Sequence, residues 1–342
     1  GYIEAGTFLA IMLGTLNGTM MVHLKISPFF LSTQLLIFAL LGLFSSWHIP
    51  SLSPLAPHLR IQLSWFKEVK RLSYFTHKNH RIYWSIICIS WFWLIGTILL
   101  SELPPFAKTI IRVDESVFIF LLLLFTIGIG IGSLLCNSVF KGKITTKAVP
   151  FLSLGMIPLL ADISSFTAPL GSAPLTLLSY LFSFQGLRLT FDILTLSFMG
   201  GLFIVPLYAF LQTHVPPSQR SQMIAYNNIV NAGFMVFASS ASFILLSFSL
   251  SIPTLIFFTA VGQLGITFYA IRVLPDATLK NLLLKILTIL FRFEVHGLEN
   301  YQKAGKRVIL VANHTSYLDA LLIAVSLPEK PLFAINLYTA QK

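Results

Sequence analysis

The sequence predicts an all-α polytopic membrane protein with about eight transmembrane helices, followed by the start of an α/β domain. Hydrophobic residues make up 56% of the 342 residues and charged residues only 10%, and the mean hydropathy is +0.82. Because a soluble protein carries about 25% charged residues, this composition indicates an integral membrane protein. Polar residues become frequent only after Arg272. We therefore predict a membrane bundle at 1–272 and the beginning of a membrane-associated soluble domain at 273–342.

The apolar segments give the expected spans. A helix that crosses the bilayer needs roughly 20 predominantly apolar residues. The segments that meet this criterion are 4–23, 29–47, 82–102, 116–137, 147–166, 189–211, 221–248 and 252–272. The apolar stretch 172–187 is short and interrupted, which favours a surface or re-entrant piece. The chain begins inside a hydrophobic segment and stops soon after a strand-like run, so we expect both ends to be cuts through a larger protein.

The formal net charge of +11 fits either a nucleic-acid partner or a positively charged cytoplasmic face. The basic residues of three alternate connections are Arg60, Lys67, Lys70, Arg71, Lys78, Arg81, Lys141, Lys143, Lys147 and Arg220. Those of the opposite connections are Lys25, Lys108, Arg112 and Arg188. Since cytoplasmic loops are the basic ones, this ten-to-four bias predicts that 48–81, 141–147, 212–220 and everything after Arg272 are cytoplasmic. The net positive charge is then explained by the orientation of the protein in the membrane. This indicates membrane lipids as partners and no nucleic acid.

The connection 48–81 is predicted to contain a basic amphipathic helix. Arg60, Lys67 and Arg71 fall on one face, and the apolar residues broadly opposite are Leu63, Trp65, Phe66 and Leu72. Such a helix suits an anionic lipid surface, and a long linker that rests on the bilayer explains the same pattern.

Small residues and ionisable residues stand out inside the spans. Two glycine pairs, at 14 and 18 and at 128 and 132, have the GxxxG spacing that lets membrane helices approach closely. Charges in spans are costly and often functional, and those here are Glu4, Asp162, Arg188 and Asp192. They lie near span ends, where a solvated interfacial charge is the alternative.

The stretch AYNNIVNAGF places Asn227, Asn228 and Asn231 at helical spacing within one span. Amide side chains in a membrane helix are expected to face partners or a polar cavity instead of lipid. We therefore predict that these three residues border a transport path or hold the helix that lines it.

Two stretches of the bundle resemble a known family. VPLYAFLQTHVPPSQRSQMIAYNNIVNAGFM resembles the penultimate helix pair of lysophospholipid transporters of the major facilitator superfamily, and YIEAGTFLAIMLGT is similar to their fifth helix. The resemblance implies that 1–272 is a partial major facilitator domain containing helices five to twelve, with 48–81 as its central cytoplasmic loop. It also implies a carrier that moves lysophospholipids to the inner leaflet.

The tail contains VILVANHTSYLDALLIAV, in which His314 and Asp319 are five residues apart. KRVILVANH reads as a short buried parallel strand and YLDALLIAVSL as the start of a helix, with Ser316 as a possible N-cap. This places the pair at a strand-to-helix corner. Asp319 accepting from one imidazole nitrogen would orient His314 and let the other nitrogen take a proton from a substrate hydroxyl. A structural histidine satisfied by the helix N-terminus is the alternative.

NHTSYLDALL, preceded by GLEN and VILVANH, resembles the first block of the glycerophospholipid acyltransferases, whose signature is N-H-x4-D. The resemblance implies that His314 is the catalytic base and Asp319 its partner. LFAIN at 332–336 is similar to the following strand of the acyl-carrier-protein-dependent type. The later blocks of that family are absent from this sequence, so we expect the chain by itself to be inactive.

Together the two resemblances imply a fusion of the acyl-ACP synthetase/2-acylglycerophosphoethanolamine acyltransferase type. It would import a lysophospholipid and acylate its free glycerol hydroxyl at the inner leaflet of a bacterial inner membrane, with the acyltransferase domain cytoplasmic. The expected donor is acyl-ACP or acyl-CoA, with acyl carrier protein as a partner and ATP if an acyl-activating domain follows. No cofactor and no metal are expected in this chain, and Cys88 and Cys136 are expected as packing residues. The alternative is a transporter of another solute with a catalytically silent tail.

Overall fold

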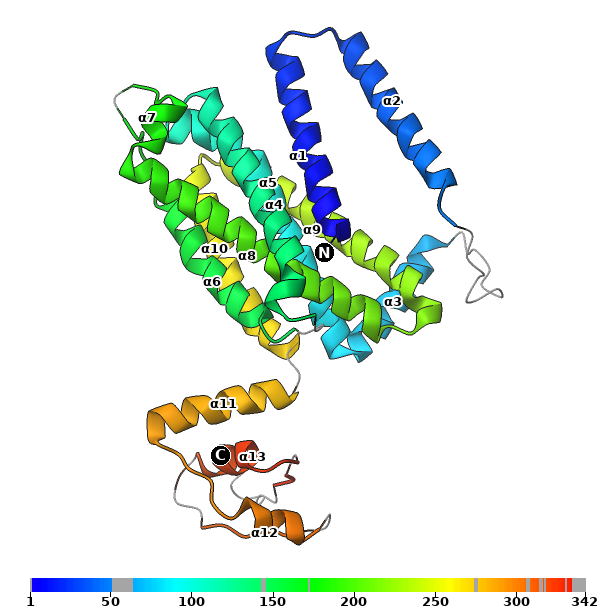
Figure 1. Cartoon of the computed structure of the whole chain (residues 1–342), viewed down its shortest axis with the longest axis vertical. Coiled ribbons are helices and arrows are strands. Elements are labelled where there is room, and N and C mark those ends of the chain that lie inside the picture. The colour runs from blue at the N-terminus through cyan, green and yellow to red at the C-terminus, as the bar shows by residue number, and fades with distance from the viewer. Residues whose placement is uncertain are drawn as a thin grey trace. The chain divides into compact units, whose positions relative to one another are not determined.

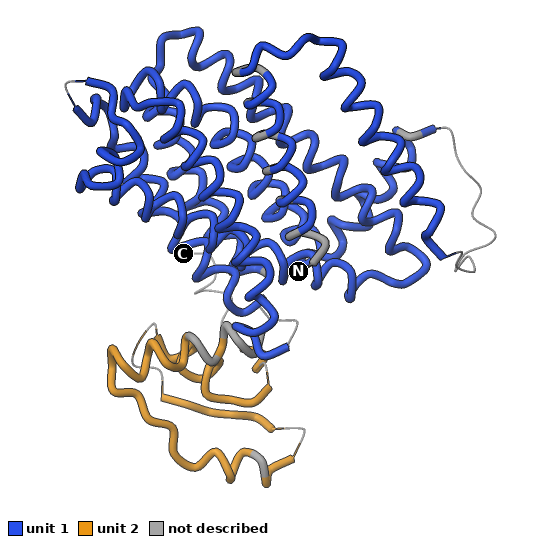
Figure 2. The backbone as a smooth tube through the Cα atoms, turned by 45° about the horizontal axis from the view of Figure 1, so that its top comes forward, with its two compact units in different colours: residues 1–273 blue, residues 274–342 orange. Residues whose placement is uncertain are grey.

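The computed structural model describes residues 2–50, 64–142, 146–171, 173–273, 276–305, 308–313, 316, 318–329 and 331–333. The chain divides into two compact units, residues 1–273 and residues 274–342 (Figure 2). The first contains the membrane-length helices, and the described residues of the second contain three helices. That the first unit is a carrier and the second an acyltransferase domain stays a prediction at this point.

The first unit is a bundle of long apolar helices (Figure 1). Its α-helices are α1 (Tyr2–His23), α2 (Pro28–Trp47), α3 (Trp65–Lys78), α4 (His80–Pro105), α5 (Glu115–Val139), α6 (Val149–Ser164), α7 (Leu177–Leu181), α8 (Phe184–His214), α9 (Arg220–Ser247) and α10 (Ile252–Ala270). The short elements η1 (Phe106–Ile110), η2 (Pro217–Gln219) and η3 (Ile271–Val273) extend α4, α9 and α10. Among the described residues, six helices are long and apolar enough to cross a membrane: α2, α4, α5, α8, α9 and α10. The expected all-α polytopic membrane protein is confirmed.

Two of the eight expected spans are not among these six helices. The segment 147–166 forms α6, which has 16 residues and contains Pro158, so it is shorter than the expected span. The segment 4–23 forms α1, a helix of 22 residues in which several side chains lie outside the described residues. The stretch 172–187 contains the five-residue α7 and the beginning of α8, as expected for a short interrupted piece.

Glycines explain why α5 and α8 lie closely side by side (Figure 1). A Cβ atom built on Gly132 would lie 2.2 Å from the carbonyl oxygen of Phe198, and one on Gly201 would lie 2.4 Å from that of Ile129. The backbones therefore touch where a side chain would stand. The GxxxG prediction is confirmed for α5, whereas a Cβ on Gly14 or on Gly18 of α1 would meet nothing within 4 Å.

A hydrogen-bonded polar side chain of α10 joins that helix to α4 and α6. Gln263 of α10 accepts a hydrogen bond from the Trp91 Nε1 of α4 at 2.7 Å. Its Nε2 donates to the carbonyl oxygen and the hydroxyl of Ser153 on α6, at 3.1 and 2.9 Å. Buried polar groups are hydrogen-bonded in stable folds, and this one fixes how α4, α6 and α10 meet.

The connection 48–81 contains α3, and Arg60 and Leu63 lie outside the described residues. Leu72 is buried and Phe66 is 70% exposed, so the apolar residues of α3 do not all pack on the bundle. The two positions are six residues apart, about 120° from a whole number of turns, so only one side of α3 packs on the bundle. That α3 rests on an anionic lipid surface stays a prediction. Arg71 Nε donates to Glu68 at 3.1 Å, and its Nη2 donates to Gln222 of α9 at 2.9 Å, which ties α3 to α9.

The charge bias makes a topological prediction about this connection. In a full-length protein in which Cys88 and Cys136 are replaced by alanine, Lys78→Cys should be labelled only from the cytoplasmic side by an impermeant thiol reagent. Lys108→Cys, equally exposed at the opposite end of α4, is the matched control and should be labelled only from outside. Labelling of position 78 in intact cells would reverse the assigned orientation.

The second unit contains α11 (Asp276–Phe291), α12 (Leu298–Lys303) and α13 (Asp319–Ser326), and α11 packs on α13. The expected buried strand before His314 is not observed: residues 308–313 are assigned to no strand, and Ile309 and Val311 are 92% and 89% exposed. A parallel strand is buried only when strands pair with both of its edges and helices cover both faces. The described residues of this unit include no strand to pair with it, so the α/β character predicted for the tail is not seen there.

Candidate functional site

Asp319 is the first residue of α13, and its carboxylate turns back over the preceding residues. Asp319 Oδ2 accepts a hydrogen bond from the backbone N–H of Ser316 at 2.8 Å, and the Asp319 N–H donates to the Ser316 carbonyl oxygen at 3.1 Å. The Ser316 hydroxyl accepts from the N–H of Leu318 at 3.1 Å. The helix begins two residues later than an N-cap at Ser316 would place it, with Leu318 as the N-cap residue. Ser316 and Asp319 still hold each other reciprocally, in the manner of a capping box.

This arrangement suits Asp319 to an electrostatic role. The half-buried carboxylate lies in the first turn of α13, where the helix dipole and backbone N–H groups favour a negative charge. A carboxylate fixed in this way can accept a hydrogen bond from the N–H of an imidazole and so determine which tautomer the imidazole adopts. His314 lies outside the described residues, so its pairing with Asp319 stays a prediction.

One comparison with known families bears on this turn. Residues 292–338 match the family model described as Acyltransferase. The match includes the extended segment 308–313, the N-H-x4-D motif and all of α13. It supports an acyltransferase domain in the second unit, and with it an acyltransferase activity. No solved structure matches the chain at a significant level.

A second polar site lies inside the helical bundle, around Asn231 of α9. The Ser90 hydroxyl of α4 donates to Asn231 Oδ1 at 2.8 Å, and Asn231 Nδ2 donates to the Tyr208 hydroxyl of α8 at 3.4 Å. Trp93 Nε1 of α4 donates to the same Tyr208 hydroxyl at 3.0 Å. These contacts connect α4, α8 and α9 through one amide.

The other two asparagines of α9 have different surroundings. Asn227 is fully buried, and neither its Nδ2 nor its Oδ1 has a hydrogen-bond partner. An unpaired buried amide is costly, which makes Asn227 a place for a water molecule or a ligand group. Asn228 is exposed, because one residue is about 100° around a helix and turns it away from the face that packs on α4. That Asn228 borders a polar cavity or a transport path stays a prediction.

Sequence reasoning missed Ser90, Trp93 and Tyr208. Their signal is a hydrogen-bonding side chain within an otherwise apolar span. That signal does not say which of them meet, since Ser90 and Asn231 are 141 residues apart in the chain.

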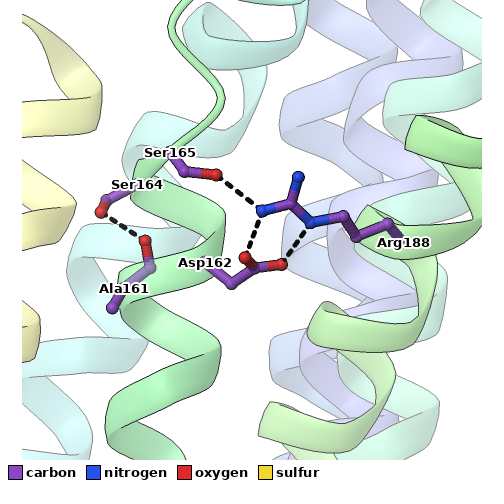
Figure 3. Close-up of polar contacts among 5 residues, drawn as sticks. All are labelled: Ala161, Asp162, Ser164, Ser165 and Arg188. Atoms are coloured by element: carbon purple, nitrogen blue, oxygen red, sulfur yellow. Dashed lines mark hydrogen bonds and ion pairs between the residues drawn. The ribbon is translucent and has the colours of Figure 1, made fainter.

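Two of the charged residues predicted to lie near span ends, Asp162 and Arg188, form an ion pair (Figure 3). Arg188 Nε of α8 donates to Asp162 Oδ2 of α6 at 2.7 Å, and Arg188 Nη2 donates to the other carboxylate oxygen and, at 2.9 Å, to the Ser165 hydroxyl. Asp192, one turn further along α8, is only 4% exposed. The interpretation of Asp192 as a solvated interfacial charge is therefore wrong, because helix packing covers it. The Glu4 side chain lies outside the described residues.

Proposed function

We propose that this chain belongs to a bacterial inner-membrane protein that carries lysophospholipids to the inner leaflet and re-acylates them there. One observation supports the proposal above the others. A segment that matches the acyltransferase model, and contains N-H-x4-D, follows directly on a bundle of membrane-length helices in the same chain. An acyltransferase joined to a carrier receives its lipid substrate at high effective concentration.

The proposed chemistry is acyl transfer from a thioester to a glycerol hydroxyl. His314 takes the hydroxyl proton while the oxygen attacks the thioester carbonyl, and the C–S bond then breaks. The departing thiolate of acyl-ACP or acyl-CoA recovers the proton from the imidazolium. Asp319, held by the Ser316 N–H at 2.8 Å, orients the imidazole and stabilises its charged form. Acyl carrier protein is the proposed partner, and ATP would be consumed by an acyl-activating domain if one follows.

Acyl transfer by the purified full-length protein tests this proposal. With a radiolabelled acyl donor and lysophosphatidylethanolamine, we expect a labelled diacyl phospholipid. Glycerol 3-phosphate and a lysolipid without a free hydroxyl are the comparison acceptors, and neither should be acylated at a comparable rate. Failure of lysophospholipids to accept the acyl chain would favour the alternative, a carrier of another solute with a silent tail.

The bundle's part in the proposal rests on α9. Replacing Asn227, Asn228 and Asn231 together by leucine should impair lysophospholipid uptake without preventing insertion, since leucine favours insertion. Interhelical hydrogen bonds of the Asn231 kind contribute about 0.6–1.7 kcal/mol, so their loss should weaken the contacts of α9 with α4 and α8 by a similar free energy. Ser240→Leu, at an exposed position on the same helix, is the matched control. Equal uptake by the control and the triple variant would reduce the asparagines to packing residues.

A further inference from the structure

The cluster at the ends of α6 and α8 leaves one buried carboxylate oxygen without a partner. Asp192 Oδ2 accepts no hydrogen bond, although the residue is 96% covered. Its carboxyl interacts directly with the carboxyl of Asp162 and with the charge of Arg188. Both oxygens of Asp162 already accept from Arg188, so the guanidinium pairs with Asp162 and not with Asp192.

The charges of this cluster do not balance. Two carboxylates and one guanidinium sum to one negative charge. Packed helices cover Asp192, whereas the side chains of Arg188 and Asp162 are 38% and 33% exposed. Tyr180 of α7 also faces Asp192, but burial raises the pKa of Tyr180 to about 12, so its hydroxyl stays neutral. That hydroxyl accepts a hydrogen bond from the Thr190 hydroxyl at 3.2 Å.

Among the described residues, the only positive charge that interacts with Asp192 is that of Arg188, which already pairs with Asp162. The acidic residues of α4 and α5 at this end of the bundle are Glu102 near the end of α4 and Glu115 at the start of α5. The basic residues between these two helices, Lys108 of η1 and Arg112, are exposed. Asp114, the N-cap residue of α5, is acidic as well. A buried uncompensated charge is unfavourable, and two adjacent carboxyl groups reduce it by holding a proton between them.

We propose that Asp162 and Asp192 share one exchangeable proton, which makes the contact between α6 and α8 a proton-binding site. The proton supplies the donor that Asp192 Oδ2 lacks and brings the net charge of the cluster to zero. A metal cation fits less well, because hard cations take about six oxygen ligands and both Asp162 oxygens are engaged by Arg188. Release of the proton would place two carboxylates in repulsion across the α6–α8 contact.

This inference goes beyond the proposed function and does not depend on it, because proton binding is measured without a lipid substrate. If the bundle is the proposed carrier, the site offers a way to couple its movement to a proton gradient. The two ideas fail separately: lysophospholipid uptake can occur without this proton, and the proton can bind in a protein that carries another solute.

Infrared difference spectroscopy of the full-length protein in lipid nanodiscs tests the site. Between acidic and alkaline buffers, the wild type should show a protonated-carboxyl band that shifts in heavy water and disappears as the pair ionises. Asp192→Asn and Asp162→Asn should each remove that band, because an amide can donate to the remaining carboxylate without a shared proton. Asp114→Asn, a half-buried carboxyl at the same end of the bundle, should keep it.

The helical content and elution volume of each variant establish that it is folded, and two independent variants guard against the misfolding of one. Retention of the full band in folded Asp192→Asn would overturn the proposal. A band that responds to the sodium concentration at fixed pH, and not to pH, would overturn it in favour of a sodium site.

Discussion

Replacing His314 by alanine should lower acyl transfer by at least about 10²–10⁴-fold, the usual cost of a lost general base. Without the imidazole, the motif lacks the base that is proposed to take the proton of the attacking hydroxyl. Binding of lysophospholipid should persist, and so should its uptake, because the helical bundle is a separate unit. The measurement is kcat for labelled acyl transfer by the full-length protein.

Asp319→Asn should also remove most of the activity. The asparagine side chain can still accept from the Ser316 N–H and so keep the turn, but it cannot stabilise an imidazolium. The double variant should be barely worse than either single variant, because the pair acts as one unit.

The matched control for the histidine is His296→Ala, an exposed histidine within the same matched segment that hydrogen-bonds Glu294 at 3.2 Å. It should retain normal turnover. If His314→Ala behaves like His296→Ala, the motif returns to its structural interpretation, a histidine satisfied at a helix N-terminus.

Gly132→Ala should strongly destabilise the contact between α5 and α8. The added Cβ would stand 2.2 Å from the Phe198 carbonyl oxygen, and a backbone atom cannot rotate away as a side chain can. The α5 and α8 helices must separate, which costs about 1–3 kcal/mol as overpacking and more if the contact opens along its length. We expect a lower yield of folded protein and a lower melting temperature in detergent.

Gly130→Ala on the same helix is the control, because a Cβ there meets nothing within 4 Å. It should be neutral or slightly stabilising, since alanine exceeds glycine in helix propensity by about 1 kcal/mol. Equal melting temperatures for the two variants would show that the close approach of α5 to α8 is not required.

The fold of the bundle was largely predictable from apolar segment length, because backbone hydrogen bonding in lipid allows little except helices. The same reasoning overestimated the length of the helix at 147–166, since composition does not show that α6 has only 16 residues. It also failed for the segment before His314. Its apolar run has the pattern of a buried strand. A buried strand forms only where neighbouring strands and helices cover it, and Ile309 is exposed among the described residues.

The sites were predictable in their residue types and less so in their pairings. The short spacing in N-H-x4-D pointed to Asp319, and the structure places it at a helix start as expected. Pairings between helices have no such local signal. Arg188 and Asp162 are 26 residues apart, and only the packing of α6 on α8 brings them together. The same packing covers Asp192, which composition alone placed near solvent.

The central claim, carriage and acylation by one protein, is tested most directly in sealed vesicles that contain the full-length protein. Labelled acyl donor is enclosed on the side of the second unit, and lysophospholipid is added only to the opposite side. We predict a labelled diacyl phospholipid whose formation stops in His314→Ala while lysophospholipid entry continues. The claim would be contradicted if lysophospholipid were acylated when added on the donor side but never when added on the opposite side.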